Sequence, residues 1–329
     1  MSELHKFLFD GLPVRGMVVR LTDTWTEILR RRASNSHTGA YAVPVRDMLG
    51  EMVAAAALMQ SNIKFDGSLT LQIFGDGPVR LAVVEVQPDL ALRATATVIG
   101  DVDATTTLSQ MVNASNEGRC AITLDPNSKF PGQQPYQGVV PLFDDQGRKL
   151  EKLSAVLEHY MLQSEQLDTT LVLAANDQVA AGLLIQRLPM AGSGNLAGSM
   201  VSKENEDQIG LNEHYNRIAI LAGSLQRDEL LTLDVDTILR RLFWEEQITR
   251  FEPMVGDTAP HFACTCSRER VGKMIVGLGQ EEAQSILAER ADIEVACEFC
   301  GTQYRFDAVD AAQLFTAPVR RVPGGAEPH

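Results

Sequence analysis

The chain has 329 residues, of which 45% are hydrophobic and 22% are charged, and its formal net charge is −14. This length predicts roughly two domains and a core that needs no disulfide bonds, and the acidic balance disfavours binding to nucleic-acid phosphates. The N-terminus lacks a secretory signal pattern, and no apolar run approaches the roughly 18 residues of a membrane span. Five cysteines are too few for a secreted disulfide framework, so we expect a cytoplasmic protein that contacts neither membrane nor nucleic acid.

Residues 1–190 alternate β-rich runs with helical patterns, which predicts one α+β domain. Asp23 is expected to cap a helix in which apolar residues recur at helical spacing, and residues 43–60 are apolar on nearly every side, as in a buried helix. Two β-rich runs around Gly75-Asp76-Gly77 predict a hairpin over 68–86. Hairpins grouped between helices indicate an antiparallel-rich sheet with helices packed on it. Further strands are predicted over 16–22, 92–98, 119–125, 136–142, 169–175 and 179–189, and a further helix over 149–166.

Residues 191–256 are predicted to form a flexible and helical linker region. The region opens with the glycine-rich stretch GSGNLAGSM, whose role the sequence leaves open, and continues with amphipathic helices. Short isolated helices are marginal in water, so we expect these helices to pack on the first domain, either permanently or in a way that can be released. Their apolar stripes consist of Tyr215, Ile218, Ala222 and Leu225, and of Val235, Ile238, Leu239, Leu242 and Phe243.

Four of the five cysteines form two close pairs near the end of the chain. Cys264 and Cys266 are two residues apart, so in an extended segment their thiols point to the same side, and Cys297 and Cys300 flank a predicted turn. Four thiolates at about 2.3 Å in a tetrahedron form a closed structural zinc site, and soft thiolates favour zinc over magnesium or calcium. We therefore predict that these four cysteines hold one zinc ion in a small domain over 257–315, which a tail over 316–329 follows.

Two other candidates are expected to be outside the site. His261 lies three residues before Cys264, but four cysteines already complete a tetrahedron, so we expect a bystander. Cys120 is expected to be a small buried side chain in a strand of the first domain.

The spacing of each cysteine pair also permits redox chemistry. Each pair can form a disulfide locally, and a disulfide sulfur is no longer an anionic metal ligand. A domain of this size depends on its metal for folding, so oxidation would unfold it. The residues alone leave open whether the site is a reversible switch or a permanently reduced zinc ribbon.

The residues bear differently on several other functions. A zinc-ribbon module for nucleic acid is disfavoured because residues 258–310 carry 5 Lys and Arg against 9 Asp and Glu, while a protein-interaction module stays open. A thiol–disulfide oxidoreductase would place its CxxC pair at the start of a helix, whereas CEFC precedes TQYRF, a predicted strand. The sequence has no nucleophile elbow and no HExxH motif, so we predict no catalytic site and no enzyme.

Several segments together resemble one known family. They are residues 49–86, 136–142, 160–175 and 180–189, with CTC at 264–266 and CEFCGTQYRF at 297–306. In these segments the chain resembles the redox-regulated bacterial holdase chaperones known as the 33 kDa heat shock protein family. The resemblance implies an α+β N-terminal domain, a helical linker region and a small C-terminal zinc-binding domain.

The resemblance also implies a mechanism. In the family, the reduced protein holds zinc through its four cysteines and is inactive as a chaperone. Oxidants acting together with unfolding stress form disulfides, which would here be Cys264–Cys266 and Cys297–Cys300. Zinc is then lost, the zinc domain and linker unfold, and the protein, often as a homodimer, binds unfolding client proteins without ATP. The chain differs from shorter family members in GSGNLAGSM and in its tail.

Overall fold

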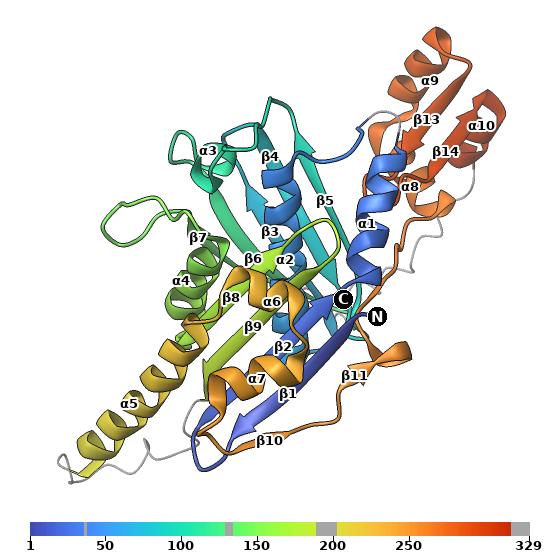
Figure 1. The fold of residues 1–329 in the computed structure, drawn as a ribbon. Helices are drawn as coiled ribbons and strands as arrows, with labels where there is room; N and C mark the ends of the chain where they lie inside the picture. The colour runs from blue at the N-terminus through green and yellow to red at the C-terminus, as the bar shows by residue number, and fades with distance from the viewer. Residues whose placement is uncertain (36–37, 129–133, 189–202, 317–329) are drawn as a thin grey trace, which may run out of the picture. The chain divides into compact units, whose positions relative to one another are not determined.

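The computed structural model describes residues 1–35, 38–128, 134–188 and 203–316 (Figure 1), and in the helix that begins at Lys203 it describes side chains from Glu213 onward. The chain falls into two compact units, Met1–Ala263 and Cys264–His329. The glycine-rich stretch and the predicted tail beyond Thr316 lie outside the described residues. Among the described helices, none is long and apolar enough to cross a membrane.

The first unit contains two six-stranded sheets, whose neighbouring strands run antiparallel except where β12 meets β5. This arrangement confirms the predicted antiparallel-rich α+β fold. Sheet A has the order β10 (Ile248–Arg250), β1 (Glu3–Phe9), β2 (Val14–Leu21), β9 (Ala180–Arg187) and β8 (Thr169–Ala175), and β11 (Met254–Val255) also pairs with β1. Sheet B has the order β12 (His261–Phe262), β5 (Ala91–Val98), β4 (Val79–Val86), β3 (Gly67–Phe74), β6 (Arg119–Pro126) and β7 (Tyr136–Pro141).

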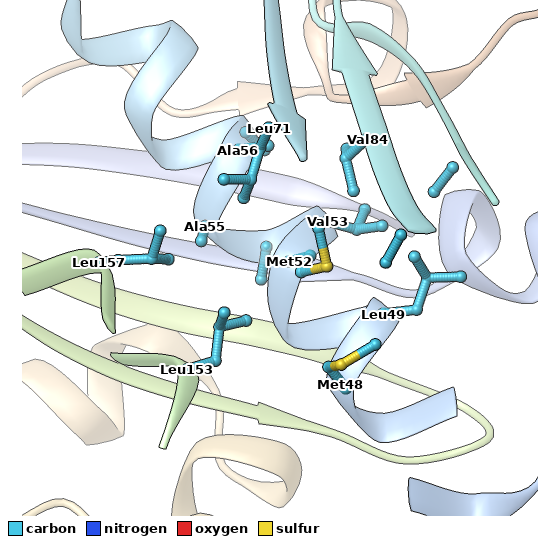
Figure 2. Close-up of a cluster of buried hydrophobic side chains, with 14 of the residues drawn as sticks. Met48, Leu49, Met52, Val53, Ala55, Ala56, Leu71, Val84, Leu153 and Leu157 are labelled. Atoms are coloured by element: carbon cyan, nitrogen blue, oxygen red, sulfur yellow. The ribbon is translucent and has the colours of Figure 1, made fainter. Parts of the chain in front are cut away.

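The helix α2 (Val43–Asn62) forms the centre of the core and contacts strands of both sheets. Its side chains are buried on nearly every side, as its composition predicts. Figure 2 shows Met52, Val53 and Ala56 of this helix together with Leu71 from β3 and Val84 from β4. The run of four alanines at 54–57 keeps the helix narrow, so that it can be covered closely on both sides.

Three more helices border this core, namely α1 (Asp23–Ser34), α3 (Leu108–Val112) and α4 (Leu153–Glu165). The prediction that Asp23 caps α1 was wrong. The N-cap position is Thr22, which makes no side-chain cap hydrogen bond, and Asp23 is the first helical residue. There the Asp23 carboxylate accepts a hydrogen bond of 2.8 Å from the Thr22 hydroxyl and adds negative charge at the positive end of the helix dipole.

The helices of the predicted linker region pack on sheet A (Figure 1). They are α5 (Lys203–Gly223), α6 (Arg227–Thr232) and α7 (Val235–Phe243), and the short 3-10 helix η1 (Gly256–Thr258) follows β11. All nine residues of the two predicted stripes are buried in one apolar cluster with Phe7 and Phe9 of β1. The rings of Phe9 and Phe243 meet edge to face with their centroids 5.0 Å apart. The helices therefore cover apolar surface of the sheet.

The second unit is small and is built around one hairpin, β13 (Asp292–Ala296) and β14 (Gln303–Asp307). Helices α8 (Arg268–Leu278), α9 (Gln280–Glu289) and α10 (Ala308–Thr316) pack around this hairpin. The strand predicted at TQYRF is confirmed by β14. In the described part of this unit, the buried apolar core consists of five side chains, those of Ile275, Ala283, Ile293, Phe306 and Ala311.

Candidate metal centre

The structure brings together the four cysteines that the sequence singles out. The Sγ atoms of Cys264, Cys266, Cys297 and Cys300 all lie within 4.8 Å of one another, and they form the only group in the described part of the chain that could hold a metal ion. The Sγ atoms of Cys264 and Cys297 are 3.7 Å apart, and those of Cys266 and Cys300 are 3.3 Å apart. A tetrahedron with metal–sulfur bonds of about 2.3 Å has edges of about 3.8 Å, so the cluster has the dimensions of a zinc site.

The second cysteine pair is held by the turn that joins β13 to β14. The backbone N–H of Cys297 donates to the carbonyl of Thr302 at 2.9 Å, and the N–H of Gly301 donates to the carbonyl of Cys297 at 2.8 Å. Gly301 has a φ of +72°, a left-handed conformation that favours glycine. The glycine after the pair therefore allows the turn that directs both thiols inward.

The first pair lies in an irregular segment that leads into α8. Ser267 caps this helix, because its hydroxyl accepts a hydrogen bond of 3.2 Å from the N–H of Arg270. Arg270 in turn donates to the carbonyl of Thr265, between the two cysteines, at 2.9 Å. The start of α8 thus fixes the path of the backbone through Cys264 and Cys266.

Two hydroxyl groups contact the sulfur atoms, and the sequence analysis missed both. The hydroxyl of Tyr304 donates to the Sγ of Cys266 at 3.1 Å, and the Oγ1 of Thr302 lies 3.1 Å from the Sγ of Cys300. The spacing of residues 300, 302 and 304 could have predicted these contacts, because alternate residues of an extended segment lie on the same side. The metal centre therefore has polar neighbours as well as its four thiols.

The four thiols differ in acidity because their neighbours differ. Burial raises the pKa of Cys297 to about 12, and burial also raises the pKa of Cys266. Burial acts in the same direction on Cys300, but hydrogen bonds from Thr302 and from the neighbouring thiols outweigh it and lower its pKa to about 7. A metal that binds four thiolates must therefore displace protons from this cluster.

The position of the CEFC pair argues against an oxidoreductase. The pair lies between two antiparallel strands, and its last cysteine is followed by a glycine and then by β14. A redox-active CxxC pair gains its reactivity at the N-terminus of a helix. The geometry of Cys297 and Cys300 is instead that of a metal-binding turn.

The two bystander predictions agree with the structure. His261 belongs to β12, where its Nδ1 lies 3.2 Å from the carbonyl of Ala259, and the group that could hold a metal ion consists of the four cysteines without it. Cys120 is fully buried in β6, and burial raises the pKa of its thiol to about 12. Cys120 is thus an inert core residue.

Comparisons with known proteins point to one family. A family model described as "Hsp33 protein" matches residues 2–307. A 33 kDa chaperonin of Chromobacterium violaceum is 42% identical over 95% of this chain and 94% of its own length. A 33 kDa chaperonin of Methylobacillus flagellatus is 38% identical over 97% of this chain and 96% of its own.

A solved structure shares the fold. The crystal structure of the 33 kDa chaperonin of Thermotoga maritima matches with a TM-score of 0.71 at 20% sequence identity, over 95% of this chain and 98% of that one. The relatives carry the name of a chaperonin and not of an enzyme, in agreement with the prediction that the chain is not an enzyme.

Proposed function

The chain belongs to the Hsp33 family of chaperonins, and from this premise we propose that it is a redox-regulated holdase that acts without ATP. In the reduced state Cys264, Cys266, Cys297 and Cys300 would hold one zinc ion, and the protein would be inactive as a chaperone. Oxidation would form the disulfides Cys264–Cys266 and Cys297–Cys300. The observation that carries the proposal is the convergence of the four thiols within 4.8 Å.

The small core of the second unit supports a structural role for zinc. The five buried apolar side chains of its described residues supply little hydrophobic stabilisation for a unit of this size. A structural zinc ion, when bound, cross-links the two cysteine pairs and contributes on the order of 10 kcal/mol to folding. Loss of the thiolate ligands would therefore unfold this unit.

The oxidation step balances with hydrogen peroxide as the oxidant. In each pair, one thiolate attacks peroxide, an S–O bond forms and the O–O bond breaks, which leaves a sulfenic acid and releases water after protonation. The second thiolate then attacks the sulfenic sulfur, the S–S bond forms and a second water leaves. Each pair loses two electrons and each peroxide gains two, and neither resulting disulfide offers an anionic ligand.

The helices on sheet A are the proposed element that oxidation releases. We assign the parts of the chain as a chaperone core over 1–190, a linker region over 191–256, a zinc-binding switch over 257–315 and a tail over 316–329. The stripes on α5 and α7 bury apolar side chains against the sheet. Released from it, these stripes and the uncovered sheet would offer apolar surface to the exposed side chains of unfolded clients.

The chaperonin family implies client proteins as partners. We further propose a homodimer in the oxidised state and a cytoplasmic location, because a reducing compartment keeps the four thiols reduced until stress arrives. Nucleic acid is not a proposed partner, because the second unit is acidic.

The test is suppression of client aggregation by the purified full chain without nucleotide. Light scattering of a thermolabile client would be followed with zinc-loaded reduced protein, with peroxide-treated protein, and with treated protein that has been reduced again in the presence of zinc. We expect suppression only by the oxidised form. Equal suppression by the zinc-loaded reduced form would refute the switch.

A further inference from the structure

The phenol of Tyr304 connects the two halves of the cysteine cluster. Tyr304 lies on β14, where it pairs with Val295 of β13, and the turn of this hairpin carries Cys297 and Cys300. Its hydroxyl reaches the other cysteine pair and donates to the Sγ of Cys266 at 3.1 Å. Tyr304 therefore belongs to the hairpin that carries one cysteine pair and contacts a sulfur of the other pair.

The direction of this hydrogen bond is fixed when a metal is bound. Cys266 is then a thiolate with no proton to donate, so the tyrosine hydroxyl must be the donor. A hydrogen bond to a thiolate withdraws electron density from the sulfur, and groups of this kind orient metal ligands and tune their basicity. The same withdrawal lowers the nucleophilicity of the sulfur, on which its attack on an oxidant depends.

We propose that Tyr304 is a positioning residue that holds Cys266 as a metal ligand and slows its oxidation. The inference rests on the proposed zinc site and deepens it, since it assigns a residue that sets the oxidant threshold. In the affected step, the Cys266 thiolate attacks hydrogen peroxide, the S–O bond forms, the O–O bond breaks and water leaves after protonation. The hydroxyl of Tyr304 opposes this step because its hydrogen bond withdraws electron density from the attacking sulfur.

The ring of Tyr304 has a separate role in packing. It lies against the apolar core of the second unit and is partly buried there. Tyr304→Phe keeps the ring and removes only the hydroxyl, so the variant separates hydrogen bonding from packing. Thr265→Val is the matched control, because it removes an exposed hydroxyl between Cys264 and Cys266 that makes no hydrogen bond to sulfur.

The experiment compares reduced, zinc-loaded full chains of the wild type and the two variants. Zinc release during peroxide treatment would be followed with a chromophoric chelator, and the oxidised cysteines would be identified by differential alkylation and mass spectrometry. For Tyr304→Phe we expect release that is faster by roughly 10-fold, with the early oxidation concentrated at Cys266. Thr265→Val should match the wild type.

A spectroscopic readout distinguishes tuning of the sulfur from loosening of the fold. With Co²⁺ in place of zinc, the thiolate-to-cobalt charge-transfer band of Tyr304→Phe should move to lower energy, because its Cys266 sulfur is more electron-rich. Unchanged release rates and an unchanged band would overturn the inference, as would equal acceleration at all four cysteines. A wild type that retains zinc under peroxide would instead contradict the proposed switch, so the two failures are distinguishable.

Discussion

At the scale of single residues, the sulfur atoms of the four cysteines form one cluster, within 4.8 Å of one another, and not two separate pairs. The short sulfur–sulfur distances of 3.7 and 3.3 Å join members of different pairs. In a tetrahedral site every sulfur is close to the other three, so this proximity favours no particular disulfide. The backbone favours bonding within each pair, because the partners are only two or three residues apart and stay close when the unit unfolds.

We predict that peroxide yields Cys264–Cys266 and Cys297–Cys300. Proteolysis under non-reducing conditions, followed by mass spectrometry, should recover each pair within one peptide. Recovery of a disulfide between the peptide that contains Cys264 and the peptide that contains Cys297 would contradict local pairing.

Removal of one of the four cysteines should weaken zinc binding. Cys297→Ser replaces a thiolate by a hydroxyl that binds zinc poorly. Changes to groups that only contact metal ligands already lower metal affinity about 10-fold, so we expect a larger fall in zinc affinity here and the loss of regulated activation. Cys120→Ala is the control, since this buried thiol lies in β6 outside the cluster. Competition with a chelator measures the zinc affinity of both variants. An affinity of Cys297→Ser equal to that of the wild type would refute the four-ligand site.

Glu51 of α2 is a half-buried acid whose charge state affects stability. It borders a cavity of about 710 Å³ between α2, α4, β8 and the start of α6. Burial raises its pKa from 4.5 to about 7, with further influence from Arg227, Asp47 and Lys152. The folded protein therefore holds a proton that the unfolded chain releases between pH 4.5 and about 7, so this residue makes the free energy of unfolding decrease as the pH rises through that window.

Glu51→Gln should remove this pH dependence. Glutamine stays neutral, so the variant should match the wild type near pH 4, below the window, and be more stable near pH 8 by up to about 3 kcal/mol, at about 1.36 kcal/mol per pKa unit. Urea unfolding at the two pH values measures the difference, and the exposed Glu117→Gln serves as the control. A stability difference that is the same at both pH values would show that Glu51 does not titrate in this way.

At the scale of secondary structure elements, α6 is held on sheet A by arginine side chains at both ends. Arg227 in its first turn donates to the carbonyl of Ala175 at the end of β8 and, at 2.8 Å, to the carboxylate of Asp47 on α2. Arg20 of β2 donates to the carbonyls of Leu230 and Leu231 at 2.7 and 3.2 Å. The carbonyls at the end of a helix lack partners within it, so Arg20 serves as a C-terminal cap provided by the sheet.

Arg20→Met should loosen this helix while keeping an aliphatic side chain in its place. Loss of charged hydrogen bonds amounts to about 1.5–3 kcal/mol, so we expect amide hydrogens of α6 and α7 to exchange roughly 10- to 100-fold faster in the reduced protein. Arg30→Met is the control, because Arg30 pairs with Glu27 on the exposed side of α1. Unchanged exchange in α6 would mean that apolar packing alone holds it.

The sequence predicts most elements of this fold because their periodicity is strong. The alternating strands around Gly75 and the stripes that include Ile218 and Ile238 lie where their patterns place them. The strands of only two or three residues, β10 to β12, carry no periodic signal and depend on their partners in the sheets. The cap of α1 was misplaced because Asp suits both the cap and the first turn of a helix.

The candidate site was predictable in its ligands but not in its surroundings. Cysteine spacing is a strong signal because few residue types bind zinc, whereas tyrosine and threonine occur for many reasons. The contact between Tyr304 and Cys266 spans 38 residues, and it depends on how the hairpin meets the segment before α8. Such a contact is a property of the tertiary structure.

At the scale of the whole molecule, a small unit that we propose depends on zinc follows a large core whose apolar surface is covered by helices. The core has its own extensive hydrophobic cluster around α2, so it can stay folded when the second unit does not. The central claim is that loss of zinc and gain of chaperone activity are one event.

The most direct measurement titrates the reduced, zinc-loaded protein with peroxide under mild heat. At each step the released zinc and the fraction of a thermolabile client kept from aggregating are determined on the same sample. We expect the two quantities to rise together, and to fall together when thiol reductant and zinc are restored. Full activity in samples that still hold their zinc would contradict this expectation.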